Sequence, residues 1–287
     1  MSRKVGAHVS AAGGIDKAIE RAHSIGANCV QIFSASPRVW QKPKLESFDT
    51  EKFFKAQKEF EVQPVVTHAL YLINLASNVP AQVEKSIKAL TFELSFDSFI
   101  KGSGVVVHLG SHQGRGWEAD KEQVARGIEI VLKNTPENST FLIENSAGQN
   151  GKLTTNLADI RWLMDQIKSS RLGWCFDTCH AFSAGYQLNP KSSVTEGAIG
   201  IIEEKIEKFK LWSQLKCIHV NDSRDPFASH KDRHDNLGEG SIPTEDFAHF
   251  LNLEQLKKLP LILEVPGIDG EGPDAENIKR LKALIHD

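Results

Sequence analysis

The sequence predicts an α/β fold in which strands and helices alternate and the strands close into a parallel (β/α)₈, or TIM, barrel. Short apolar runs rich in β-branched residues recur along the chain, and longer amphipathic segments separate them. There are about eight such strand–helix units, the number that a TIM barrel needs. The chain has 287 residues and no evident linker, low-complexity stretch or repeat, so we expect a single domain over residues 1–287.

The expected strands are short and almost entirely apolar, as parallel strands are when both faces of the sheet are buried. From the N-terminus they are Lys4–Val9, Asn28–Phe33, Gln63–His68, Val105–Leu109, Thr140–Glu144, Leu172–Asp177, Leu215–Val220 and Pro260–Val265.

The expected helices are marked by apolar periodicity and by residues that favour helix ends. Segment Ile15–Ile25 carries apolar residues three and four apart, and Gly26 stands where a C-terminal cap belongs. Segment Pro80–Gly102 begins with a proline, which suits the first helical position. The threonine that begins segment Thr244–Leu259 is expected to cap that helix, and Pro273 is expected to open the last helix.

Composition and charge exclude several classes of protein. No apolar run approaches the roughly 18 residues that a membrane span needs, and Met1–Lys4 leads directly into the first expected strand, so we expect no membrane contact and no targeting peptide. The net charge of -3 argues against nucleic-acid binding driven by bulk charge. The four cysteines lie in or beside apolar runs, and reduced, buried thiols predict a cytoplasmic protein. No exposed apolar helix face stands out, so we expect a monomer without an obligate protein partner.

The most informative feature is the polar residue that ends almost every expected strand. The C-terminal ends of parallel barrel strands emerge on one face, where barrel enzymes hold their active sites. Side chains from distant parts of the sequence should therefore converge on one small volume. They are His8, His68, His108, Glu144, Asp177, His219 and Glu264.

A single histidine or aspartate at a strand end is most often a hydrogen-bonded loop cap. A group of imidazoles and carboxylates with no arginine or lysine at the strand ends instead needs bound cations. This mixture of donors suits zinc, manganese or iron, whereas Mg²⁺ prefers oxygen ligands. Two loops add donors, because His180 follows the sixth strand and Asp232 and His234 lie two residues apart. Closely spaced metals indicate hydrolytic displacement at phosphorus or carbon.

Several long motifs follow one another along the chain. They are Gly6–Gly14, His68–Leu75, Ile143–Gly148, Cys175–Phe182, His219–Ser223, Asp232–His234 and Leu237–Gly240. Together they resemble the motifs of the endonuclease IV family, and the match extends from the first strand to Glu264. The resemblance implies a zinc-dependent TIM-barrel hydrolase of DNA repair, which cuts the phosphodiester bond 5′ to an abasic site in duplex DNA. The products would be a 3′-hydroxyl and a 5′-deoxyribose phosphate.

The resemblance also implies three zinc ions, with Mn²⁺ as a substitute, and assigns their ligands by motif position. The implied sites are His68, His108 and Glu144 for the first ion, Glu144, Asp177, His219 and Glu264 for the second, and His180, Asp232 and His234 for the third. Glu144 and Glu264 would also be catalytic, because they would orient the attacking water. His8 would orient a ligand or a bound water without binding metal itself.

Loops around the mouth of the barrel would recognise DNA. In the family an arginine and a tyrosine–leucine pair enter the minor groove as the abasic sugar leaves the helix, and Arg38, Tyr71 and Leu72 occupy those positions here. Trp40 either joins this surface or packs in the core. The chain has Ala35-Ser36 where the family usually has a Lys-Asn pair, which removes one phosphate contact and lowers the salt dependence of DNA binding.

Two other functions fit parts of the sequence. A sugar isomerase or epimerase on a related divalent-metal barrel also places His, Glu and Asp at strand ends, but it has no evident use for the third ligand set or for Arg38 and Tyr71. A non-catalytic binder of DNA lesions would keep the fold and lose ligands, yet every expected ligand is present. Cys175 and Cys179 flank Asp177 at a metal-like spacing, but without a second cysteine pair we interpret them as core residues.

Overall fold

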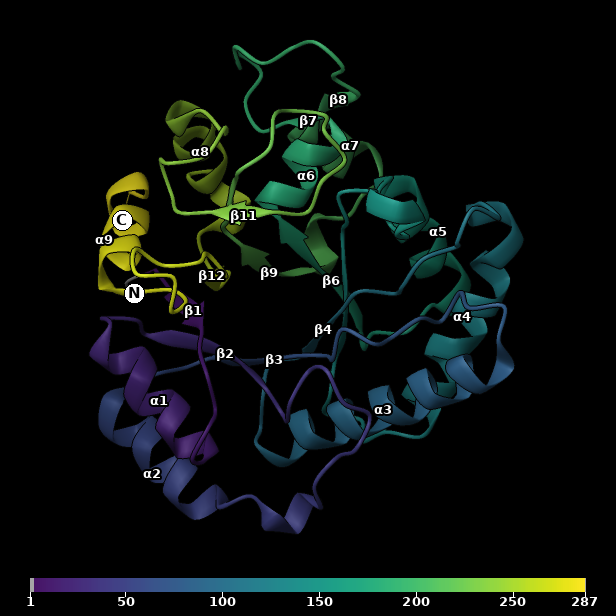
Figure 1. Cartoon of the computed structure of the whole chain (residues 1–287), viewed down its shortest axis with the longest axis vertical. Coiled ribbons are helices and arrows are strands. Elements are labelled where there is room, and N and C mark those ends of the chain that lie inside the picture. Colours follow the sequence, from purple (N-terminus) through teal and green to yellow (C-terminus); the bar gives the residue numbers. More distant parts are fainter. Residues whose placement is uncertain (1–2, 287) are drawn as a thin grey trace.

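The structure is a computed structural model of the chain, and it describes residues 3–286. Eight parallel strands form a closed barrel in the order β1-β12-β9-β6-β5-β4-β3-β2, and helices surround it (Figure 1). The barrel strands are β1 (Val5–His8), β2 (Cys29–Phe33), β3 (Val65–His68), β4 (Val105–Val107), β5 (Phe141–Glu144), β6 (Leu172–Asp177), β9 (Leu215–His219) and β12 (Leu261–Leu263). Each apolar run contains one barrel strand, so the predicted TIM barrel is confirmed.

The helices pack outside the barrel. They are α1 (Ile15–Ser24), α2 (Thr50–Phe60), α3 (Pro80–Phe99), α4 (Trp117–Lys133), α5 (Leu157–Ile167), α6 (Thr178–Ala184), α7 (Ile202–Lys208), α8 (Thr244–Leu251) and α9 (Ala275–Leu284). Short 3-10 turns add η1 (Leu45–Ser47), η2 (Gln149–Gly151), η3 (Trp212–Gln214) and η4 (Glu254–Leu256), and two small ribbons pair β7 (Tyr186–Gln187) with β8 (Gly200–Ile201) and β10 (Asp222–Ser223) with β11 (His234–Asp235). The last helix, α9, packs on the first strand, β1, so the first and last elements of the fold lie side by side (Figure 1).

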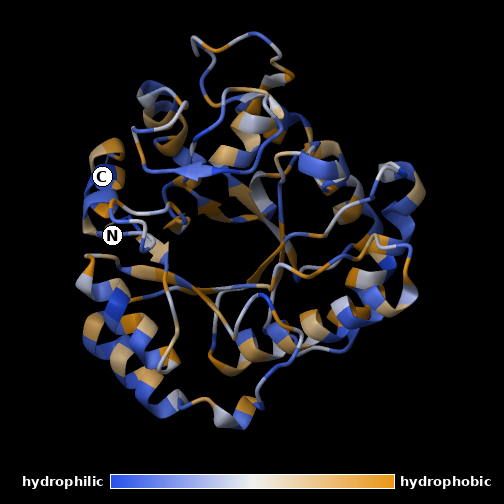
Figure 2. Cartoon of the chain, in the orientation of Figure 1, coloured by the Kyte–Doolittle hydropathy of each residue, from blue (hydrophilic) through white to orange (hydrophobic). Residues whose placement is uncertain are grey.

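The main apolar core lies between the barrel and its helices. In α1 the buried residues include Ile15, Ala18, Ile19 and Ala22, whose spacing places them on one helix face. Figure 2 shows this pattern in the outer helices, which carry both hydrophobic and hydrophilic positions, whereas the barrel strands are mainly hydrophobic. In the part of the chain that the structure describes, no helix combines the length and the apolar character of a membrane span.

A second, smaller apolar cluster fills the inside of the barrel. We call it the inner apolar layer; it consists of Cys29, Val66, Val106, Leu142, Cys175, Cys217 and Ile262. Each of these residues comes from a different barrel strand. The remaining strand, β1, has Gly6 at this level, where a β-carbon would lie only 2.2 Å from the carbonyl oxygen of Cys29. The layer closes the barrel below the ends of the strands.

The helix ends agree with the sequence in two places and differ in two others. Gly26 follows α1 with a positive φ of 82°, and the proline that begins α3 is at its start, as predicted. Thr244 is instead the first residue of α8 and makes no capping hydrogen bond, and this helix ends at Leu251. Pro273 does not open α9, because Asp274 is the cap and its carboxylate accepts from the backbone N–H of Asn277.

Candidate metal centre

The end of each barrel strand contributes one polar side chain to the same level of the barrel. Strand side chains alternate between faces, so a residue two positions after a member of the inner apolar layer points to the same side. We call the resulting set the polar layer; it consists of His8, Gln31, His68, His108, Glu144, Asp177, His219 and Glu264. Seven of these residues were predicted from strand ends, and the structure brings them together. The eighth residue, Gln31, was not predicted from the sequence.

Gln31 is fully buried and links three members of the polar layer. Its Nε2 donates to Glu264 Oε1 at 2.6 Å and lies 2.9 Å from His8 Nδ1, while its Oε1 lies 2.8 Å from His219 Nε2. Since an amide oxygen only accepts, His219 must donate from Nε2. A glutamine inside the apolar run of β2 was the signal that could have identified it.

Glu144 lies at the centre of the cluster, fully buried at the end of β5. Its Oε2 is 3.2 Å from His108 Nε2 and 3.4 Å from His68 Nε2, and its Oε1 is 3.1 Å from His219 Nδ1. Burial by itself raises the pKa of this carboxyl, but the imidazoles of His108 and His219 outweigh burial and hold the pKa well below its ordinary value. Glu144 is therefore a carboxylate shared between two groups of imidazoles.

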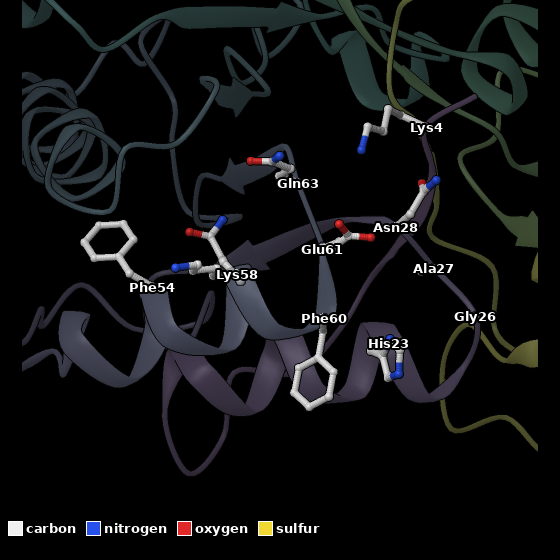
Figure 3. Close-up of a pocket in the computed structure, with 11 residues that line it drawn as sticks. Lys4, His23, Gly26, Ala27, Asn28, Phe54, Lys58, Phe60, Glu61 and Gln63 are labelled. Carbon is white, nitrogen blue, oxygen red and sulfur yellow. The ribbon is translucent and has the colours of Figure 1, made fainter. Parts of the chain in front are cut away.

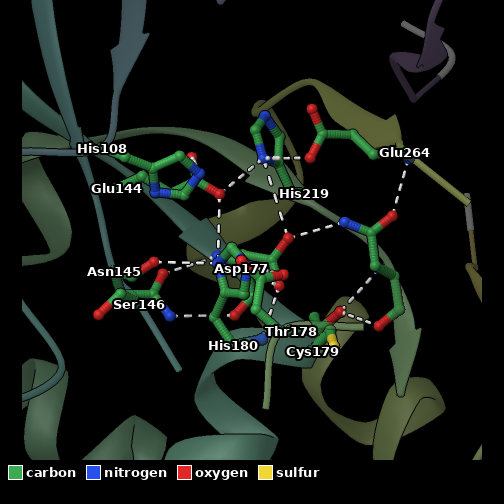
Figure 4. Close-up of polar contacts among 12 residues, drawn as sticks. His108, Glu144, Asn145, Ser146, Asp177, Thr178, Cys179, His180, His219 and Glu264 are labelled. Carbon is green, nitrogen blue, oxygen red and sulfur yellow. Dashed lines mark hydrogen bonds and ion pairs between the residues drawn. The ribbon is translucent and has the colours of Figure 1, made fainter. Parts of the chain in front are cut away.

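A second set of donors forms around His219, as Figure 4 shows. Its Nδ1 lies 3.2 Å from Glu264 Oε2 and 3.9 Å from Asp177 Oδ2. Asn221 holds the carboxylate of Asp177 and the main chain of Glu264 in place, because its Nδ2 donates to Asp177 Oδ2 and its Oδ1 accepts from the backbone N–H of Glu264, each at 2.7 Å. Donor atoms of Glu144, Asp177, His219 and Glu264 all lie within 4.8 Å of one another.

The third predicted ligand set comes from α6 and from the loop that leads into β11. Asp232 Oδ1 lies 2.9 Å from His180 Nε2 and 3.6 Å from His234 Nε2. Within a limit of 4.8 Å between all donor atoms, however, these two imidazoles form a group with Asp177 and not with Asp232. His68, His108 and Glu144 form a further group within the same 4.8 Å limit. All predicted ligands thus lie in one continuous cluster.

The protein fixes which nitrogen of each imidazole faces the cluster. The Nδ1 of His68 lies 2.7 Å from the carbonyl oxygen of Ala69. The Nδ1 of His180 lies 3.0 Å from the carbonyl oxygen of Asn145, and the Nδ1 of His234 lies 3.3 Å from the carbonyl oxygen of Glu264. A carbonyl accepts only, so each Nδ1 carries a proton and Nε2 is the nitrogen that faces the carboxylates, with its lone pair free for a metal when the ring is neutral. In His219 the contact with Gln31 reverses the roles and directs Nδ1 inward. Such orientation by outer partners is typical of metal-binding histidines.

The charges of the cluster also call for cations. His180 Nε2 and Asp232 Oδ1 lie 2.9 Å apart. If His180 were neutral and Asp232 ionised, a lone pair on each atom would face the other, which is favourable only with a proton or a metal between them. Burial by itself lowers the pKa of His180, yet Asp177 and Asp232 raise it well above its ordinary value. Burial lowers the pKa of His108 to about 4, so that ring is a neutral donor at pH 7. Among residues 3–286, Glu144 Oε2 and His234 Nε2 are buried without a hydrogen bond. These residues fit bound metal.

The predicted DNA contacts lie on the rim of the cluster. Tyr71 is 58% exposed, and its ring packs edge-on against Phe33 with centroids 5.3 Å apart. The backbone N–H of Tyr71 donates to the carbonyl of Pro37 at 3.0 Å, which ties its loop to the loop of the exposed Arg38. Leu72 is half-buried and packs against the core, as does Trp40. Tyr71 and Arg38 are thus the accessible members of the predicted set.

Two cavities open beside these residues on the same face. The first, of about 380 Å³, is lined by cluster residues together with Tyr71, and the second, of about 690 Å³, extends from His8 to Arg38. A further cavity of about 750 Å³ lies at the opposite end of the barrel, beside residues that precede the strands, such as Asn28 and Gln63 (Figure 3). Its lining includes none of the predicted site residues.

Three of the four cysteines, Cys29, Cys175 and Cys217, lie below the cluster in the inner apolar layer, and Cys179 lies in α6 beside it. All four are free and buried, and Cys179, like Cys175, is a core residue as predicted. Cys175 and Cys217 nevertheless place their sulfur atoms within 4.8 Å of a nitrogen of His219. Both belong to the inner apolar layer, so the carboxylates and imidazoles of the polar layer separate them from the mouth.

Comparison with known proteins agrees with this geometry. A family model described as a xylose isomerase-like TIM barrel matches residues 19–284. The probable endonuclease 4 of Persephonella marina is 38% identical, covering 98% of this chain and 97% of that protein, and that of a Sulfurihydrogenibium species is 35% identical, covering 98% and 99%. The crystal structure of endonuclease IV from Thermus thermophilus matches with a TM-score of 0.83 at 30% identity and covers 98% of each chain. With this similarity over its full length and with its barrel confirmed, the chain belongs to the endonuclease IV family.

Proposed function

We propose that this endonuclease acts in DNA repair and hydrolyses the phosphodiester bond 5′ to an abasic site in duplex DNA, leaving a 3′-hydroxyl and a 5′-deoxyribose phosphate. The observation that carries the proposal is the set of imidazoles whose free nitrogens are turned by the protein toward four buried or half-buried carboxylates. Such a preorganised donor set serves metal-dependent hydrolysis.

We propose three zinc ions in this cluster, for which Mn²⁺ is a substitute. His68, His108 and Glu144 would hold one ion, and His180, Asp232 and His234 would hold another. The ion between them would be held by Asp177, His219, Glu264 and the shared Glu144. Nitrogen-rich donor sets of this kind favour zinc over Mg²⁺. The bound cations would supply positive charge for the phosphorus transition state and would make water more acidic.

The residues of the chain would perform the remaining steps. Glu144 and Glu264 would orient the attacking water, because both carboxylates are held at the base of the mouth, Glu144 by the surrounding imidazoles and Glu264 by Gln31. His8 lies 3.2 Å from Glu264 Oε1 and, with Gln31, fixes the direction of that carboxylate. The Nε2 of His8 is buried without a hydrogen bond within residues 3–286, and His8 lines the cavity of about 380 Å³, so this nitrogen would serve a bound water.

Arg38, Tyr71 and Leu72 would contact the DNA beside the abasic sugar. The exposed ring of Tyr71 stands at the edge of the smaller cavity, and Arg38 lines the adjoining one. Tyr71 is the wedge in this arrangement, and Leu72 supports it from its half-buried position. Insertion of a wedge is cheaper beside a missing base, because less stacking is lost there. We place the activity in the cytoplasm, where the four free cysteines remain reduced.

The test is incision of a duplex oligonucleotide that carries one abasic analogue, with both product ends identified. The proposal expects cleavage 5′ to the lesion, a 3′-hydroxyl that a polymerase extends, and loss of cleavage after chelation. The principal rival, a divalent-metal sugar isomerase or epimerase, expects intact DNA together with turnover of an aldose or ketose. That second result would refute the proposal and would leave the metal cluster in place.

A further inference from the structure

Lys152 is a charged residue at the edge of the metal-ligand cluster. It lies in a loop, so the polar residues at the strand ends did not point to it. It directly follows η2, in the loop after β5, whose last residue is Glu144. Its Nζ donates to Asp232 Oδ2 at 2.7 Å. The lysine side chain is 35% exposed and the aspartate side chain is 22% exposed, so the pair is sheltered but is reached by solvent.

The two carboxylate oxygens of Asp232 have different partners. Oδ2 accepts from Lys152, whereas Oδ1 faces His180 Nε2 at 2.9 Å and His234 Nε2 at 3.6 Å. The backbone of Asp232 is held by the same loop, because its N–H donates to Gln149 Oε1 at 2.9 Å. The loop around η2 thus fixes both the main chain and the side chain of this residue.

The main chain of Lys152 is itself fixed. Its backbone N–H donates to the carbonyl of Gln149 at 3.1 Å, its carbonyl accepts from Thr155 Oγ1 at 3.1 Å, and its backbone pairs with Ser111 in an isolated β-bridge. An ammonium group that starts from a fixed main chain loses less freedom when it holds a carboxylate in one orientation than a mobile surface lysine does.

We infer that Lys152 is a positioning residue, which occupies one oxygen of Asp232 so that the other is presented to the cation held with His180 and His234. The inference rests on the proposed three-metal site. Hydrogen-bonded partners of metal ligands commonly change metal affinity by about 10- to 100-fold when they are removed. Lys152 therefore affects one of the three metals and leaves the other two unchanged.

The test is a zinc titration of the full chain. Metal-free protein is equilibrated with a series of buffered free zinc concentrations, and bound zinc per chain is measured. In Lys152→Met, the free zinc concentration at which one of the three zinc equivalents binds is expected to rise by about 10- to 100-fold. The concentrations at which the other two equivalents bind are expected to stay the same. Lys152→Arg, which keeps a donor to Asp232, is expected to recover most of that affinity. Circular dichroism checks that each variant is folded.

Lys205→Met is the matched control, because Lys205 lines the same neighbouring cavity as Lys152 and forms no ion pair within residues 3–286. An unchanged titration of Lys152→Met, or tighter zinc binding, overturns the inference. So does a wild-type chain that never binds a third equivalent. A normal titration together with a raised KM for DNA would make Lys152 a phosphate contact instead. Because no DNA is present, the altered titration stands even if the chain fails to cut abasic sites.

Discussion

Glu144 is the residue on which most of the cluster depends, because both of its carboxylate oxygens face imidazoles. His68 and His108 lie on the side of Oε2, and His219 lies on the side of Oε1. These three imidazoles come from the ends of β3, β4 and β9. One carboxylate thus joins parts of the chain that are far apart in sequence, and its negative charge compensates several donors at once.

Glu144→Gln keeps the size of this side chain and removes its charge. Removing a hydrogen-bonded partner of a metal ligand typically lowers activity by about 10- to 100-fold. Because Glu144 is itself a proposed ligand, we expect Glu144→Gln to lower abasic-site cleavage by more than about 100-fold and to lose bound zinc. The barrel should still fold, because its apolar layers are unaffected. Incision rates and zinc content check the prediction, with Glu137→Gln as a surface control, since the Glu137 side chain is 94% exposed. Near wild-type cleavage would exclude the bridging role.

Asp97 provides a pH-dependent prediction at the same scale. Burial raises the pKa of this α3 carboxyl to about 7, although Thr67 donates a hydrogen bond to it. The unfolded carboxyl titrates near pH 4, so between about pH 4 and pH 7 only the unfolded chain loses the proton. Stability from this group is therefore fully present below about pH 4 and is lost as the pH rises to about 7.

Asp97→Asn cannot ionise and keeps an oxygen that accepts from Thr67. Its free energy of unfolding relative to wild type is expected to rise from pH 4 to pH 7 and then to level off. Urea unfolding of both proteins at several pH values measures this difference in unfolding free energy. Both proteins contain the same histidines, so the contribution of histidine titration cancels in the difference. A difference that does not vary with pH would contradict a buried, protonated Asp97.

Sequence alone identified most of the cluster, and its two omissions have physical reasons. The residues predicted from the strands end their apolar runs or lie one position before the end, and a polar group there is visible without any structure. Gln31 was missed because its apolar run continues to Phe33, so the polar residue lies inside the run. Lys152 lies in a loop, where no periodicity relates it to Asp232, and only the folded chain brings them together.

At the scale of elements, the strands were predictable and some helix ends were not. Each barrel strand needs a short apolar run, which is a local property of the sequence. A cap depends on backbone dihedral angles and on which neighbouring side chain reaches the free N–H groups. Asp274 reaches the N–H of Asn277, so α9 begins after Asp274 and not at Pro273. Thr244 lies inside α8, where its hydroxyl does not reach such a group.

The loop after β3 yields a prediction about DNA binding. Tyr71→Ala removes an exposed ring that packs on Phe33 and lies edge-on to the ring of His68 at a centroid distance of 6.1 Å, but Tyr71 is not itself a proposed metal ligand. Aromatic contacts with bases contribute about 1–3 kcal/mol each, so we expect binding of abasic duplex to weaken by about 5- to 150-fold while zinc content is unchanged. Tyr71→Phe is the matched control. Fluorescence anisotropy and metal analysis measure both quantities, and lost zinc with normal binding would show that this loop is misplaced.

The loop after β2 is anchored to α3 by a buried ion pair between Lys42 and Glu93. Their side chains are only 10% and 1% exposed. Removing one partner of such a pair typically costs about 3–5 kcal/mol, because the remaining charge stays buried. Glu93→Gln is therefore expected to lower the unfolding free energy by roughly that amount and to weaken DNA binding through the Arg38 loop, with kcat less affected.

Urea unfolding and the split between KM and kcat measure these two effects of Glu93→Gln. Glu20→Gln, which breaks an exposed pair with Lys17, serves as the control and should leave both unchanged. A Glu93 variant with normal stability and normal KM would contradict the anchoring role.

At the scale of the whole molecule, the closed barrel explains how the site is assembled. Seven of the eight strands contribute an inward side chain to the inner apolar layer, and β1 has Gly6 at that level. Because side chains alternate along a strand, the residue two positions later in every strand belongs to the polar layer. The parallel direction of all eight strands brings the polar positions to one end. The loops at that end then add His180, Asp232 and His234. The barrel supplies a rigid base, and the loops supply the surface that would meet DNA.

The central claim is that this cluster is a three-metal site, and a crystal structure of the purified chain with anomalous diffraction at the zinc absorption edge tests it most directly. We predict three anomalous peaks, one near each of the proposed ligand sets, with Glu144 between two of them. A single peak, peaks outside these residues, or an empty cluster in protein grown with zinc would contradict it.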